Sequence, residues 1–149
     1  QLLASRPEFV KSLAKGADKE TMVLILLQSE DMFLQTRAVK FLARLAILPD
    51  SKVKLVAKGC LAPLVHITTR AEDEEVLLLC LTAFLNLSTI SSNQVTICRA
   101  ALDLLLYICR SMDLSEEVRR LSSGVLSNLS RHPNNRSCFY RAELAVKRE

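Results

Sequence analysis

Apolar residues recur along this chain at intervals of three and four positions, the period that places them on one face of an α-helix. The pattern is clearest in three segments, each of which begins with Asp, Glu or Ser residues that can cap a helix N-terminus or complement its dipole. These features predict three long helices, over residues 30–47, 72–89 and 114–131. Half of the residues are hydrophobic whereas only 3 are Gly and 4 are Pro, which favours an all-α protein.

The three long helices repeat one another in sequence. Three nine-residue stretches align without gaps at a spacing of 42 residues: 38–46, 80–88 and 122–130. A fixed period of this size indicates an α-solenoid, in which no unit can bury its apolar face alone and neighbouring units stack. The period predicts units over residues 6–47, 48–89 and 90–131, followed by a truncated fourth unit over 132–149.

Two shorter helices are predicted in each unit before the long one. The first follows a Pro- or Asn-containing break, at residues 52–58, 94–99 and 136–141. The second is predicted at residues 21–28, 60–67 and 101–108. Gly16 and Gly59 lie between these two helices in the first and second units, where glycine can end a helix in the left-handed conformation.

The charge and apolar runs limit the classes of partner. The net charge is +4, and its 20 basic and 16 acidic residues are spread along the chain. This bias tolerates an acidic partner and is not typical of nucleic-acid binding. The longest apolar run, residues 76–85, is far shorter than a membrane span, so no membrane partner is expected.

The five cysteines form no Cys-x-x-Cys pair, and all lie within apolar helical patterns: Cys60, Cys80, Cys98, Cys109 and Cys138. We interpret them as small buried hydrophobes of a reduced compartment, the cytoplasm or the nucleus. The chain begins with Gln1 and stops inside an apolar helical pattern. We therefore expect it to be part of a longer protein.

Residues that could carry catalysis are scarce. The chain has two histidines, His66 and His132, and its sequence holds no glycine-rich phosphate loop. Cys138 and His132 lie six residues apart across a proline-containing turn, which gives them no reason to meet as nucleophile and base. The acidic run 72–75 is better explained as a helix N-terminus than as a metal site. We therefore predict a protein that is not an enzyme and needs no cofactor or metal.

The order of short helix, glycine turn, middle helix, acidic turn and long helix resembles the armadillo repeat family. The family's third helix ends in Leu-Ser-Asn-Leu, which Leu126-Ser-Asn-Leu129 matches; Leu85-Asn-Leu87 nearly matches, and Ala43-Arg-Leu45 departs by carrying Arg44. The resemblance implies a right-handed α-solenoid of three-helix armadillo repeats, a fold that binds partners. HEAT repeats, which have a similar period, are the nearest alternative.

In proteins of this family the third helices line a concave groove, and the motif asparagine can bond the backbone of an extended peptide. The resemblance places Arg44, Asn86 and Asn128 at this position, although they could instead be solvent-facing residues without a ligand. Six other groove residues are predicted: Arg37, Lys40, Leu78, Leu79, Thr82 and Arg120. Leu78 and Leu79 could equally belong to the core.

The resulting prediction is an interaction scaffold or adaptor that holds an extended protein segment with acidic and apolar residues. One alternative is a structural domain that packs in cis against the rest of a larger protein. Another alternative is a nucleic-acid-binding solenoid. It is less favoured because that mode needs several aromatic residues for stacking, and only Phe33 lies near the start of a groove helix while the other groove positions carry none. The chain has no Trp, so it lacks the aromatic slots with which import receptors of this family bind lysine-rich signals.

Overall fold

The computed structural model describes residues 17–147 and is all-α within that range, without a strand. Its elements, in chain order, are α2 (Lys19–Leu27), α3 (Met32–Leu45), α4 (Pro49–Ala57), α5 (Leu61–Arg70), α6 (Glu74–Leu87), α7 (Ser91–Arg110), α8 (Glu116–Ser130), the 3-10 turn η2 (Pro133–Asn135) and α9 (Arg136–Lys147). None of these helices is long and apolar enough to cross a bilayer.

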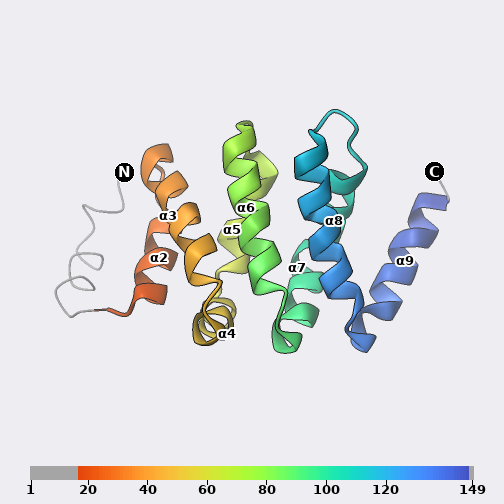
Figure 1. The fold of residues 1–149 in the computed structure, drawn as a ribbon, viewed down its shortest axis with the longest axis horizontal. Coiled ribbons are helices and arrows are strands. Elements are labelled where there is room, and N and C mark those ends of the chain that lie inside the picture. Colours follow the sequence, from red (N-terminus) through yellow and green to blue (C-terminus); the bar gives the residue numbers. More distant parts are fainter. Residues whose placement is uncertain (1–16, 148–149) are drawn as a thin grey trace.

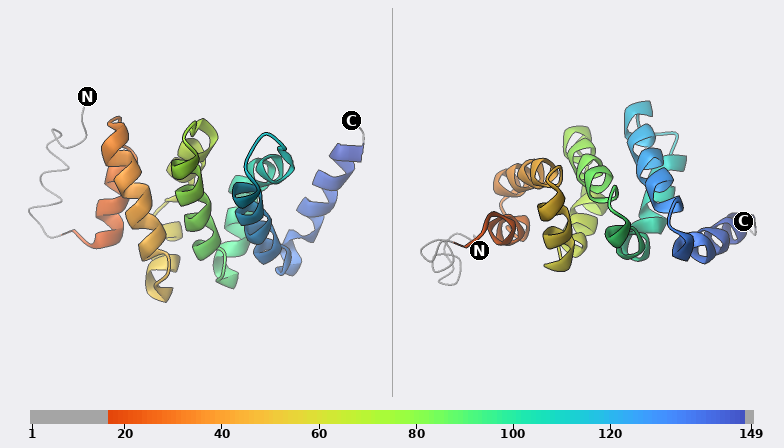
Figure 2. Two further views of the ribbon diagram at one scale, coloured as in Figure 1. Left: turned by 45° about the horizontal axis from the view of Figure 1, so that its top comes forward. Right: turned by 60° about the horizontal axis from the view of Figure 1, so that its bottom comes forward.

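The helices follow one another along the long axis of the molecule in the order of the sequence (Figure 1). Helices α3, α6 and α8 are the three predicted long helices, and we keep this name for them although α7, with 20 residues, is longer. They lie side by side, and α6 packs against both of the others. Helices α2, α5 and α7 lie behind them, while α9 lies at the end opposite α2 (Figure 2). One face of the row is therefore formed by the three helices that the 42-residue period predicts to be equivalent.

The predicted long helices are confirmed, and each is capped as its sequence indicates. Asp31 accepts a hydrogen bond from the Phe33 amide at 2.8 Å, at the start of α3. Asp73 caps α6 and Ser115 caps α8 in the same manner. These side chains satisfy backbone amides that have no partner inside the helix.

The two helices predicted over 94–99 and 101–108 are instead one continuous helix, α7. The physical reason is the absence of a glycine. Gly59 has φ +95° and separates α4 from α5, whereas Ala100 stands near the equivalent position in α7 and keeps helical geometry. The turn predicted at Gly16 lies outside the described residues.

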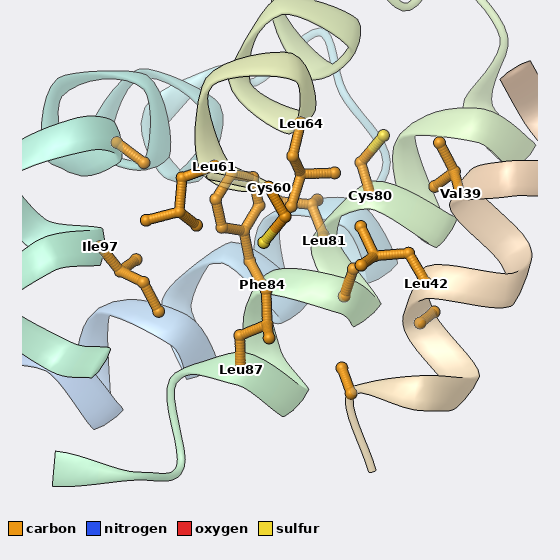
Figure 3. Packing of buried hydrophobic residues seen from close by; sticks show 14 of the residues in the cluster. Val39, Leu42, Cys60, Leu61, Leu64, Cys80, Leu81, Phe84, Leu87 and Ile97 are labelled. Carbon is orange, nitrogen blue, oxygen red and sulfur yellow. The ribbon is translucent and has the colours of Figure 1, made fainter. Parts of the chain in front are cut away.

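The core runs through all the long helices and is centred on Phe84, which is fully buried (Figure 3). Leu42 is equally buried at the preceding 42-residue position. Leu126, at the following position, is only half-buried. Helix α6 packs between two long helices whereas α8 contacts one, so burial along the period depends on the neighbours of each helix.

Two buried asparagines repeat one hydrogen-bond arrangement that ties successive units together. Asn93 Nδ2 donates to the carbonyl oxygens of Leu87 at 3.0 Å and Lys52 at 3.1 Å. Asn135 Nδ2 donates to the carbonyl oxygens 6 and 41 residues earlier, at 2.8 and 3.2 Å. Asn93 therefore joins the end of α6 to α4, and Asn135 joins the end of α8 to α7. In the sequence, these asparagines indicate only a break before a helix.

Candidate functional site

The outward face of α3 carries a row of basic side chains. Arg37, Lys40 and Arg44 are spaced by three and four residues, so they lie on one side of the helix, and all three are exposed. Leu42, on the opposite side, is fully buried. Three of the predicted groove residues therefore share one accessible stripe, which we call the α3 basic stripe.

The α3 basic stripe has no acidic partner within the described residues. The ion pairs among the described residues lie elsewhere: they join Lys58 to Asp18 at 2.9 Å and Arg120 to Glu116 at 2.7 Å. The Arg37 guanidinium carbon instead lies 5.6 Å from the centroid of the Phe33 ring, a cation–π contact. The charge of this stripe is thus available to an external group.

Two phenylalanines flank the α3 basic stripe. Phe33 is 67% exposed and Phe41 is 47% exposed. Phe41 was missed in the sequence analysis, because Ala83 and Val125 follow it at 42-residue steps and both are fully buried. Its spacing of four residues from Arg37 is the signal that could have placed it beside the stripe. Exposed aromatic rings next to unpaired cations are typical of binding surfaces.

The predicted groove residues of α6 are neither fully buried nor fully exposed. Leu78 and Leu79 are half-buried and pack against the core from its edge. Thr82 is also half-buried, and its hydroxyl donates to the Leu78 carbonyl oxygen at 2.7 Å. This part of the face therefore offers a partly apolar surface with one hydroxyl already engaged.

Asn86 and Asn128 make contacts within the protein. Asn86 Nδ2 donates to the carbonyl oxygen of Ala43 at 3.0 Å, and Asn128 Nδ2 donates to Ser88 Oγ at 2.9 Å. Ala43 lies on α3, and Ser88 is the C-cap residue of α6, so each bond reaches the preceding long helix. Both side chains are half-buried. One of the two N–H groups of each carboxamide is thus used between units, and the predicted contact with a peptide would rely on the other N–H and the oxygen.

Arg120 differs from the basic residues of α3. Its guanidinium is paired with Glu116 one turn earlier on α8, and both side chains are exposed. Glu117 and, on α6, Glu74 and Glu75 are exposed as well. Exposed charge on the long helices is therefore basic along α3, acidic at the first turn of α6, and partly paired at the start of α8.

The cysteines divide into two groups. Cys60, Cys80 and Cys98 are buried, whereas Cys109 and Cys138 are half-buried, so the expectation of five buried thiols is only partly met. Burial raises the pKa of Cys60 to about 12 and that of Cys80 to about 11. These two thiols are held in their neutral form at physiological pH.

The remaining candidates for catalysis or metal binding lie at the surface or cap a helix. His66 is exposed, and His132 Nδ1 accepts a hydrogen bond from the Asn134 amide at 3.1 Å at the start of η2. The acidic run 72–75 is exposed. Across residues 17–147, no cluster of three or more His, Cys, Asp or Glu side chains could hold a metal ion.

No family model matches the chain, and no curated protein matches it. A solved structure does. The chain is similar to the crystal structure of an engineered protein from the Northeast Structural Genomics Consortium, with a TM-score of 0.71 and 23% sequence identity. The match covers 90% of this chain and 32% of the engineered protein. At this identity the likeness concerns the fold alone.

Proposed function

We propose that this chain is a right-handed armadillo-type α-solenoid that binds an extended segment of a partner protein along α3, α6 and α8. The 42-residue period and the Leu126-Ser-Asn-Leu129 ending support the assignment to armadillo repeats. The alignment of the three equivalent helices in one row supports a shared binding face (Figure 1). Such a chain acts as a scaffold or adaptor of the cytoplasm or the nucleus rather than as an enzyme.

The observation that carries this proposal is the α3 basic stripe with its flanking phenylalanines. Three cations without an acidic partner among residues 17–147 favour a ligand that brings carboxylates. Phe33 and Phe41 offer apolar area next to those cations. The partner segment therefore combines acidic residues with an apolar anchor, a pairing that gives both attraction and binding energy.

The charges of the other two long helices determine which end of the partner segment is acidic. The exposed Glu74 and Glu75 would repel carboxylates of the partner, whereas Glu116 is paired with Arg120. Its acidic end consequently lies over α3, and its apolar or neutral part continues toward Leu78 and Leu79 on α6. The second N–H of Asn86 can then bond the backbone of the segment.

A selection from a displayed library of random peptides tests this function. We expect enrichment of Asp and Glu beside a Leu, Phe or Ile, and we expect the charge reversals Arg37→Glu and Arg44→Glu together to weaken the selected peptide about tenfold or more. Lys54→Glu is the matched control, because Lys54 is an exposed lysine on α4, away from the long-helix face. Selection of neutral or basic peptides, or equal weakening by the control, would contradict the proposal.

A second candidate is single-stranded nucleic acid, which the position of Phe41 favours. Phe33 and Phe41 alternate with Arg37 and Arg44 on one helix, and basic residues interleaved with aromatic rings are typical of strands bound by stacking. A salt titration with a single-stranded oligonucleotide separates the two functions. Tight binding that falls steeply with salt would favour this candidate, since counterion release makes nucleic-acid binding strongly salt-dependent.

A further inference from the structure

Two cysteines far apart in sequence meet between α7 and α9. Cys98 on α7 and Cys138 on α9 line the same hollow between these helices. Cys98 is 2% exposed, whereas Cys138 is half-buried and packs against the core from its edge. The two thiols also interact: burial raises the pKa of Cys98 to about 11, and the neighbouring Cys138 thiol contributes to that increase.

A basic side chain lies against the more accessible of the two sulfurs. Arg141, one turn further along α9, donates from Nη2 to Cys138 Sγ at 3.6 Å. The thiolate is the form of a cysteine that attacks an oxidant, and an adjacent guanidinium stabilises negative charge on sulfur before the attack. Cys109, the other half-buried thiol, lies on α7 outside this hollow. Accessibility, an adjacent cation and a second thiol therefore coincide at Cys138.

We propose that Cys98 and Cys138 form a reversible disulfide when the protein meets a peroxide. In the first step the Cys138 sulfur attacks a peroxide oxygen; the S–O bond forms, the O–O bond breaks, and hydroxide leaves and takes the thiol proton as water. In the second step the Cys98 sulfur attacks the Cys138 sulfenic acid, the S–S bond forms, and hydroxide leaves with the Cys98 proton as water. Two thiols and one hydrogen peroxide thus give one disulfide and two waters.

The bond would join the last described helix to the body of the molecule. Helix α9 meets the rest of the chain at η2 and through a few half-buried side chains, among them Cys138, Phe139 and Ala142. Helices at an edge with few buried contacts open more readily than the core. A covalent link from α9 to α7 suppresses that opening, so an oxidant would hold α9 in place. This inference is independent of the proposed binding function.

Peptide mapping of the oxidised protein tests the pairing. The full chain is treated with one equivalent of hydrogen peroxide, blocked with N-ethylmaleimide and digested without reductant for mass spectrometry. We expect a linked peptide containing Cys98 and Cys138, lost on adding dithiothreitol and absent from Cys138→Ser. The variant Cys109→Ser is the matched control and should form the same link. Amide hydrogen exchange in α9 should slow about tenfold on oxidation.

The role of Arg141 is tested by the rate of the same reaction. Arg141→Met should form the disulfide about threefold more slowly or worse, with the same final link. Links from Cys138 to Cys109 or to a second chain, or sulfinic acid at Cys138 beside an unmodified Cys98, would overturn the proposal. These overturning outcomes are measured on the wild-type chain, so they do not depend on the folding of any variant.

Discussion

The side-chain amide of Asn86 donates a hydrogen bond to the carbonyl oxygen of Ala43 at 3.0 Å, across the contact between α6 and α3. The same position in the preceding unit holds Arg44, which is exposed and belongs to the α3 basic stripe. Equivalent positions in the repeat thus differ in role: Asn86 ties two helices together, and Arg44 remains available to a ligand.

The first prediction follows from this difference. Asn86→Ala leaves the carbonyl oxygen of the buried Ala43 without this donor and should lower the free energy of unfolding by about 1 to 2 kcal/mol. Arg44→Ala should change it by less than about 0.5 kcal/mol, because an exposed side chain without a partner is removed. Urea unfolding followed by circular dichroism measures both. A larger loss in the Arg44 variant would show that the stripe has a structural role.

The second prediction concerns the repeated asparagine bonds. Asn93→Ala or Asn135→Ala removes two hydrogen bonds to backbone carbonyls at a buried site and should cost about 2 to 3 kcal/mol. Asn134→Ala, at the exposed neighbouring position, should cost less than about 0.5 kcal/mol. Thermal unfolding compares the three variants. Similar stabilities for all three would mean that these carboxamides do not connect the units.

The third prediction concerns thiol reactivity. Cys109 and Cys138 should react with a maleimide in the native protein, whereas Cys60 and Cys80 should stay unmodified. Mass spectrometry of the labelled peptides locates the modified thiols. Labelling of Cys60 or Cys80 at the same rate as Cys138 would contradict the structure.

The fourth prediction is a loss of stability at alkaline pH. The pKa values of Cys60 and Cys80 are raised in the folded state to about 12 and about 11, from an ordinary value of 9.0. The contribution of these thiols to the free energy of unfolding is fully present below their pKa in the unfolded chain. It is lost as pH rises from 9.0 toward their pKa in the folded protein, because in that range only the unfolded chain releases the protons readily. Cys60→Ala should flatten this dependence. Denaturation midpoints measured across the pH range provide the check.

The fifth prediction concerns Asp18, which caps α2. The Thr21 hydroxyl, followed by the Lys58 ammonium 2.9 Å away, holds the pKa of the Asp18 carboxyl well below its ordinary value of 3.8. Thr21→Val and Lys58→Met should each raise this pKa, as measured by NMR titration. Since the folded pKa is lowered, the stability linked to Asp18 is present above the unfolded value and lost as pH falls through the folded one. An unchanged pKa in both variants would exclude these contacts.

The long helices could be predicted from sequence because the forces that define them are local. In α3 the cap Asp31 and the buried Leu42 lie within one helix, and in α6 the cap Asp73 and the buried Phe84 do so as well. Gly59 likewise ends a helix through its own backbone conformation, with φ +95°. The spacing of Arg37, Lys40 and Arg44 likewise places these residues on one side of α3, while their assignment to a groove came from the resemblance to armadillo repeats.

Contacts between units were decided only by the tertiary structure. The exposure of Phe41, the bond from Asn86 to Ala43 and the meeting of Cys98 with Cys138 depend on which helices pack side by side about 40 residues apart. The 42-residue period predicts equivalent positions but not equivalent neighbours, because within residues 17–147 helix α3 contacts one of the other two long helices whereas α6 contacts both. Local hydrogen bonding determines where each helix lies in the chain, and packing between units determines which side chains remain open to a partner.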